Sequence, residues 1–177
     1  MPGRTQAEAV RNYIEPIQRA VSCLQGVGKI QRTGVPRHYG QFGAWVLNTP
    51  VSGMVLPGFG RLFASQRYEL VQTTENEHSD PEREPFRVST REYIYRLERD
   101  DPSWVMEWHW HPKGDSPERN PHIHPTVDPK AHLPCPRFAI EDVIGGCIAL
   151  GASPSCDDWE QRLRDTLDVH KMFRTWE

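Results

Sequence analysis

Four of the chain's eight histidines form two His-x-His pairs in one short segment, WVMEWHWHPKGDSPERNPHIHP, which covers residues 104–125. The first pair is His109 and His111, and the second is His122 and His124. Neutral imidazoles bind transition metals, imidazoles exchange protons near neutral pH, and protonated imidazoles bind phosphate. A segment with two such pairs is therefore the strongest candidate for a functional site in the sequence.

Strand alternation would separate these histidines from the tryptophans beside them. If residues 104–111 form a strand, Glu107, His109 and His111 point to one face, and the tryptophans and methionine point to the other. The tryptophan face is typical of a core face. The histidine face is then left for water or a ligand.

The two His-x-His segments are predicted to pair antiparallel across the polar loop between them. A register that places His111 opposite His122 also places His109 opposite His124, because the sum of paired residue numbers is constant along the ladder. A one-residue slip would put Ile123 among the histidines instead of on the tryptophan side. All four imidazoles are therefore expected on one patch of sheet.

The first chemical interpretation is a metal-free ribonuclease without a cofactor. In it a histidine pair acts as general base and general acid on RNA, with His111 and His122 as the favoured pair, and a nearby cation stabilises the phosphorane. The predicted catalytic residues are His109, His111, His122 and His124, and the predicted substrate-binding residues are Lys113, Arg119 and Trp110.

The second interpretation is a metal-dependent hydrolase or oxygenase at the same place. Its ion would be zinc or another divalent transition metal, although no known zinc-site spacing is matched. The predicted ligands are His109, His111, His122, His124, Glu107 and His132. Removal of metal distinguishes the two interpretations, since it should abolish the activity of a metal-dependent enzyme and leave that of a metal-free ribonuclease.

The elements that must position the site follow an α+β order. A capping box at Thr5 and Glu8 and apolar residues at helical spacing predict a helix that ends near Gly26 or Gly28. Short apolar runs between residues 29 and 112 indicate strands. Helices are then expected over residues 139–150 and from Ser155 onward. We expect one domain with an antiparallel sheet, an N-terminal helix and two C-terminal helices, all packed on one face.

Composition limits the class of protein. The 177 residues include no apolar run long enough for a membrane helix, and the first residues lack a signal-peptide core. The four scattered cysteines form no disulfide framework. These features predict a soluble cytoplasmic protein without membrane contact. Residues 1–71 carry eight basic and three acidic side chains, within a chain of net charge −3. This asymmetry keeps nucleic acid open as a partner. Residues 73–85 are charged and are expected to form a mobile loop.

The order EYIYRLERDDPSWVMEWHWHP, PHIHP, HLPCPR and AIEDVIGGCI resembles the TumE-like toxin family of bacterial toxin–antitoxin systems, over residues 91–150. The chain departs from that pattern in its long N-terminal part and in the helix expected near its C-terminus. The resemblance implies an intracellular toxin or defence-associated protein that acts on RNA and is neutralised by an antitoxin. A third interpretation is a non-enzymatic interaction module of a defence or prophage locus, which recruits a protein partner.

Overall fold

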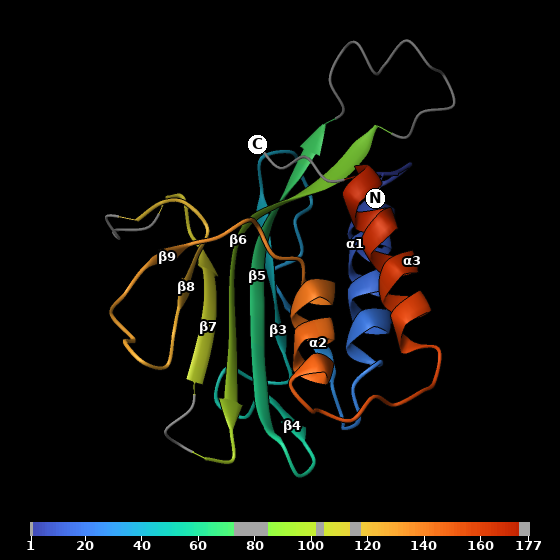
Figure 1. Cartoon of the computed structure of the whole chain (residues 1–177). Coiled ribbons are helices and arrows are strands. Elements are labelled where there is room, and N and C mark those ends of the chain that lie inside the picture. Colours follow the sequence, from blue (N-terminus) through green and yellow to red (C-terminus); the bar gives the residue numbers. More distant parts are fainter. Residues whose placement is uncertain (1, 73–84, 102–104, 114–117, 174–177) are drawn as a thin grey trace.

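The computed structural model describes residues 2–72, 85–101, 105–113 and 118–173. In this part of the chain, three helices cover one face of a nine-stranded antiparallel sheet, as Figure 1 shows. The predicted fold class, including the N-terminal helix and the two C-terminal helices on one face, is confirmed. The predicted mobile loop at 73–85 lies almost entirely outside the described residues. None of the helices described is long and apolar enough to cross a membrane.

The first helix, α1, covers Gln6–Val21 and begins where the capping pattern predicted. The Thr5 hydroxyl accepts a hydrogen bond from the Glu8 amide at 3.1 Å, and the Glu8 carboxylate accepts one from the Arg4 amide at 2.9 Å. One of the amides that a helix start leaves unpaired, that of Glu8, is thereby satisfied, and the Glu8 side chain fixes the residue before the cap. Pro16 is accommodated inside the helix on its buried face. The helix therefore presents one continuous apolar stripe to the sheet.

The sheet is built around two long central strands, β5 and β6. The strand order is β2-β3-β5-β6-β7-β8-β9, with β1 paired to β6 and β4 paired to β5. The β5–β6 ladder continues for the full length of both strands and is interrupted by a bulge at Arg67 and Tyr68. The strands are β1 (Pro2–Gly3), β2 (Ile30–Thr33), β3 (Phe42–Leu47), β4 (Met54–Leu56), β5 (Gly60–Gln72), β6 (Phe86–Arg99), β7 (Val105–Trp110), β8 (His122–His124) and β9 (Leu133–Pro134).

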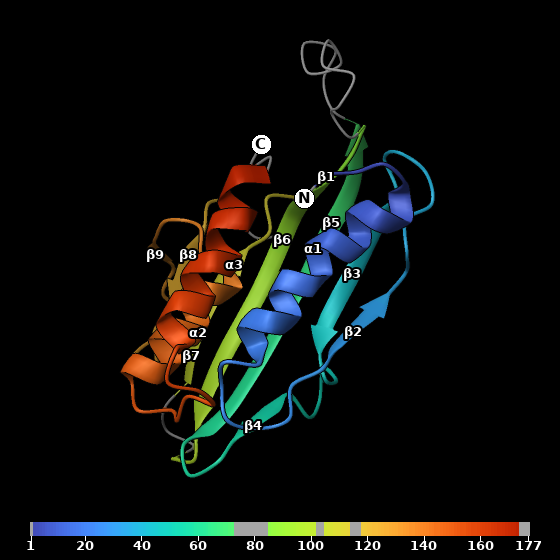
Figure 2. The ribbon, with the colours of Figure 1, turned by 90° about the vertical axis from the view of Figure 1, so that its right-hand side faces the viewer.

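The C-terminal part contributes α2 (Ile140–Ala149) and α3 (Trp159–Phe173). The expectation that the last helix starts at Ser155 is wrong, because the backbone there is held by the end of α1. The Ser155 amide donates to the Cys23 carbonyl at 2.8 Å, and the Ser155 hydroxyl donates to the Ser22 carbonyl. The helix begins only after the chain leaves this contact. Figure 2 shows α1 and α3 side by side over the sheet.

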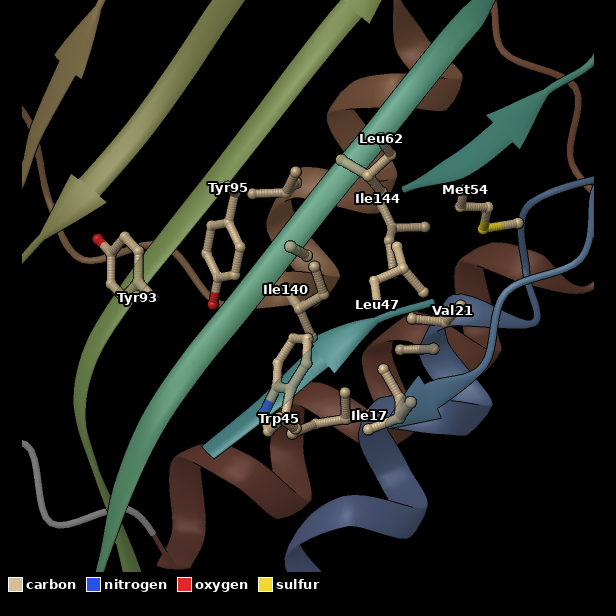
Figure 3. Close-up of a cluster of buried hydrophobic side chains, with 14 of the residues drawn as sticks. Ile17, Val21, Trp45, Leu47, Met54, Leu62, Tyr93, Tyr95, Ile140 and Ile144 are labelled. Atoms are coloured by element: carbon tan, nitrogen blue, oxygen red, sulfur yellow. The ribbon is translucent and has the colours of Figure 1, made fainter. Parts of the chain in front are cut away.

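The core lies between the helices and the sheet. Strand β5 alternates between core-facing residues such as Leu62 and outward-facing residues such as Phe63. Figure 3 shows how apolar side chains from both layers interlock. The labelled residues are Ile17 and Val21 from α1, Trp45 and Leu47 from β3, Met54 from β4, Leu62 from β5, Tyr93 and Tyr95 from β6, and Ile140 and Ile144 from α2. Helices therefore cover one face of the sheet, while the opposite face carries the histidines.

A buried contact between a histidine and a carboxylate joins the two C-terminal helices. His170 Nδ1 of α3 lies 2.6 Å from Glu141 Oε1 of α2, and both side chains are at most 1% exposed. The other ring nitrogen of His170 lies 3.3 Å from the carbonyl oxygen of Tyr13 in α1. Because a buried polar or charged group without a partner is costly, this contact fixes how the three helices meet.

We expect Glu141→Ala to lower the free energy of unfolding by about 3 kcal/mol, because it leaves the enclosed His170 without its carboxylate partner. Urea denaturation followed by circular dichroism measures the change. Glu160→Ala is the matched control, since Glu160 is an exposed α3 residue that pairs only with Arg164 at 3.6 Å among its described contacts. Equal effects of the two substitutions would contradict a structural role for the buried pair.

Candidate metal centre

The histidines are positioned by the strand order β6-β7-β8-β9 at one edge of the sheet. Strand β7 points Trp108 and Trp110, 6% and 3% exposed, into the core, and it points His109 to the opposite face. The predicted separation is therefore confirmed for Trp108 and Trp110 against His109, and Trp104 lies outside the described residues. Local alternation produces it, because the tryptophans bury the largest apolar area only when they face the helices.

The predicted register of the two histidine strands is wrong by two residues. His109 lies opposite His122, and Glu107 lies opposite His124. The apolar pattern cannot distinguish these two registers, because a shift of two residues keeps every side chain on the same face. The connection between the strands decides the register, since His111 follows the end of β7 and is not part of the ladder.

Five histidines form one cluster on this face, including His132, which directly precedes β9. His109 lies with its ring centroid 5.5 Å from that of His122 and 4.6 Å from that of His124. His111 lies 5.2 Å from His122, and His132 stacks on His122 at 4.7 Å. The ring nitrogens form two overlapping triads within 4.8 Å, namely His109, His111 and His122, and His122, His124 and His132.

Backbone carbonyls fix the orientation of two of these rings. His122 Nδ1 lies 2.8 Å from the carbonyl oxygen of Asn120, and His124 Nδ1 lies 2.9 Å from that of Pro129. In each ring Nδ1 must carry the hydrogen and donate it, so Nε2 of the neutral ring keeps its lone pair. His122 is fully buried, and its Nε2 has no hydrogen-bond partner among the residues that the structure describes. This arrangement, with Nδ1 donating to a carbonyl and Nε2 left available, is the one that metal-binding histidines adopt.

The site also contains an acidic group held by an arginine. Glu107 Oε2 lies 3.1 Å from His109 Nε2, and Glu107 Oε1 lies 3.5 Å from Arg96 Nε. Arg96 also contacts Glu98 of its own strand. The carboxylate of Glu107 therefore lies between a cation and the histidine cluster. A fixed carboxylate at this place can serve as a further ligand or accept a proton.

The environment favours the neutral form of two of the histidines. Burial, followed by the charge that each neighbouring imidazole would carry, lowers the pKa of His109 from 6.5 to about 3. Burial also lowers the pKa of His124, although its hydrogen bond to the Pro129 carbonyl opposes this shift. Because metal binding requires unprotonated imidazole, these two residues are ready to bind an ion at neutral pH without first losing a proton.

The other predicted site residues lie at different distances from the cluster. Lys113 is exposed and lines a groove beyond the end of β7. Arg119 is exposed, and no contact with the cluster is seen. Trp110 faces the core, where it packs against Tyr93 and lies beneath Arg137. The structure thus brings together the five histidines and Glu107 but does not bring Trp110 or Arg119 to them.

A groove of about 410 Å³ opens beside His109 on the outer face of the sheet. Its lining includes Phe63 from β5, and Ile94 and Arg96 from β6, none of which sequence reasoning assigned to the site. The available signal was weak: Phe63 and Ile94 are apolar residues at outward positions of strands, and single apolar side chains are common on protein surfaces. Only the strand order shows that they adjoin Glu107 and His109.

Comparison of the chain with known protein families, characterised proteins and solved structures finds no match. The geometry of the site is therefore what indicates its chemistry.

The metal-free protein should lose stability as the pH falls from about 6.5 toward 3. His109 has its ordinary pKa of 6.5 when unfolded and about 3 when folded. Above pH 6.5 it is neutral in both states and has no effect. Below 6.5 only the unfolded chain readily binds the proton, so acidification favours unfolding. Urea denaturation at several pH values, in the presence of a chelator, measures the slope of the free energy of unfolding against pH. We expect His109→Asn to flatten it, and an unchanged slope would show that His109 does not contribute.

Proposed function

We propose that the protein is a metal-dependent hydrolase that holds one divalent transition-metal ion, zinc or a similar ion, in its histidine cluster. The observation that carries this proposal is His122, which is fully buried with Nδ1 bonded to the Asn120 carbonyl and Nε2 unpartnered. A buried nitrogen without a partner costs about 1–3 kcal/mol, and a metal bond at Nε2 removes that cost. A general base uses the same ring orientation, so the full burial of His122, and not its orientation, is what favours a bound ion.

One ion is proposed, although there are two histidine triads. Both triads include His122, whose only available nitrogen is Nε2, so they are alternative ligand sets around one centre. Zinc–nitrogen bonds of about 2.0–2.1 Å place tetrahedral ligand atoms about 3.3 Å apart. Small rotations of the imidazoles would therefore draw the nitrogens, now within 4.8 Å of one another, around the ion.

Three imidazole ligands leave a fourth position on the ion for water. Because the neutral rings would not offset its charge, a bound divalent ion would lower the pKa of a coordinated water toward about 7 and so supply a nucleophile at neutral pH. Glu107, held by Arg96, is the carboxylate placed to accept the proton of that water or to orient it. Arg96 then acts as a positioning residue and not as a catalytic one.

Purified protein should contain about one equivalent of zinc or a similar ion, and His122→Ala should lose it, because the shared ligand is removed. Elemental mass spectrometry and competition with a chromophoric chelator measure occupancy and affinity. The double variant His111→Ala/His132→Ala removes one less buried member of each triad, should also lose the ion, and keeps the test informative if His122→Ala fails to fold. His38→Ala, an exposed histidine outside the cluster, is the control. A folded protein that binds none of these ions would overturn the proposal.

Metal-free cleavage of RNA is the second candidate for the same cluster. A groove of about 520 Å³ beyond the end of β7 is lined by three cations, Arg67, Arg91 and Lys113, and by the carboxylates of Glu69 and Glu92, which pair with the two arginines. The remaining excess of positive charge favours a phosphate-bearing substrate. This candidate includes the partners that the toxin-family resemblance implies, namely RNA as substrate and an antitoxin in the cytoplasm.

The two candidates predict opposite responses to a chelator. Metal-free RNA cleavage would persist in the chelator and fall by about 10²–10⁴-fold in His111→Ala or His122→Ala, because the general acid or base is lost. Lys113→Ala should weaken it as well, whereas Lys130→Ala, which alters another exposed lysine, should not. Cleavage of a labelled RNA, followed on denaturing gels, measures both effects. Cleavage that stops in the chelator would exclude the metal-free mechanism.

A further inference from the structure

The groove beside His109 runs along the outer face of the sheet and ends at the proposed metal centre. Its floor is formed by outward-facing residues of β3, β5 and β6, and its last members are Arg96, Glu107 and His109. A volume of about 410 Å³ falls within the range of small-molecule sites. The groove and the cluster therefore share two residues, Glu107 and His109.

Most of the groove is apolar although it faces solvent. Ala44 and Val46 of β3, Phe63 of β5 and Ile94 of β6 line it, and Ile94 is 46% exposed. Hydroxyl groups of Thr33, Thr49 and Ser65 lie among them. Apolar side chains gathered in a concave site indicate a ligand with an apolar body.

The end of the groove has a different character. The proposed ion would bring two positive charges among neutral imidazoles, and Arg96 adds one, while Glu98 and Glu107 bring two negative charges. The end therefore carries one net positive charge. Such an end complements a single anionic or electron-rich oxygen group at the tip of an apolar body.

We propose that this groove binds a small carboxylic acid, or the matching acyl group of an ester or amide, with its apolar chain along the sheet and its carbonyl oxygen at the metal. This inference rests on the proposed metal centre and names its substrate class. In hydrolysis, the oxygen of the water bonds to the acyl carbon, the bond to the leaving oxygen or nitrogen breaks, and a proton from the water passes to the leaving group. The products are the carboxylic acid and an alcohol or amine.

Binding of hexanoate to the zinc-loaded full-length chain, measured by nuclear magnetic resonance titration, tests the inference. Metal occupancy is measured first. Hexanoate should bind at least about tenfold more tightly than acetate, because each buried methylene contributes up to about fourfold. It should also bind at least about tenfold more tightly than hexanol, which has a similar chain without the charge. Equal affinities of hexanoate and either probe would overturn the inference.

Variants separate the groove from the metal centre. Ile94→Gln should weaken hexanoate binding about fivefold and leave acetate binding unchanged, and Ser65→Leu, which fills the groove, should act in the same direction. Val55→Gln is the matched control, because Val55 is 53% exposed on β4 and does not line the groove. Unchanged hexanoate binding in both groove variants would place the ligand elsewhere.

The outcomes distinguish the two proposals. A chain that holds zinc but does not prefer hexanoate keeps the metal centre and refutes the substrate class. A chain that holds no divalent transition-metal ion refutes both. Retained hexanoate preference after zinc removal would refute the metal-directed end of the groove.

Discussion

The alternation of apolar and polar side chains along β7 is the constraint on which the rest of the site depends. Its tryptophans must face the helices to bury their large apolar surface, and this requirement leaves Glu107 and His109 on the opposite face. Strand β6 anchors β7 on one side and β8 pairs with it on the other, so the histidines of two strands meet. The packing of the core and the assembly of the site therefore share one physical cause.

Bringing five imidazoles together has a cost in free energy for the folded protein. Burial and mutual repulsion disfavour protonation of His109, as its pKa of about 3 shows, and His122 keeps a buried nitrogen without a partner. Carbonyl groups of Asn120 and Pro129 hold two rings in one orientation, although a freely rotating ring could find other partners. A buried polar atom without a hydrogen-bond partner destabilises the folded protein. A bound cation is the simplest compensation.

The helices cover one face of the sheet, and the histidine cluster and the groove lie on the other face. The buried contact of His170 and Glu141 and the apolar core lie on the covered face. On the outer face, the exposed Ile94 lies near the charged pair of Arg96 and Glu107. The groove and the proposed metal centre share this outer face.

The sequence alone determined the elements and the face of each side chain, because helix capping and strand alternation depend on residues close together in the chain. It could place His109 and His122 on one face, but it could not choose between registers two residues apart. Only tertiary structure decided that His109 faces His122, that His132 joins the cluster, and that Arg96 holds Glu107 beside the groove. These contacts depend on loop paths and strand order, which local periodicity does not encode.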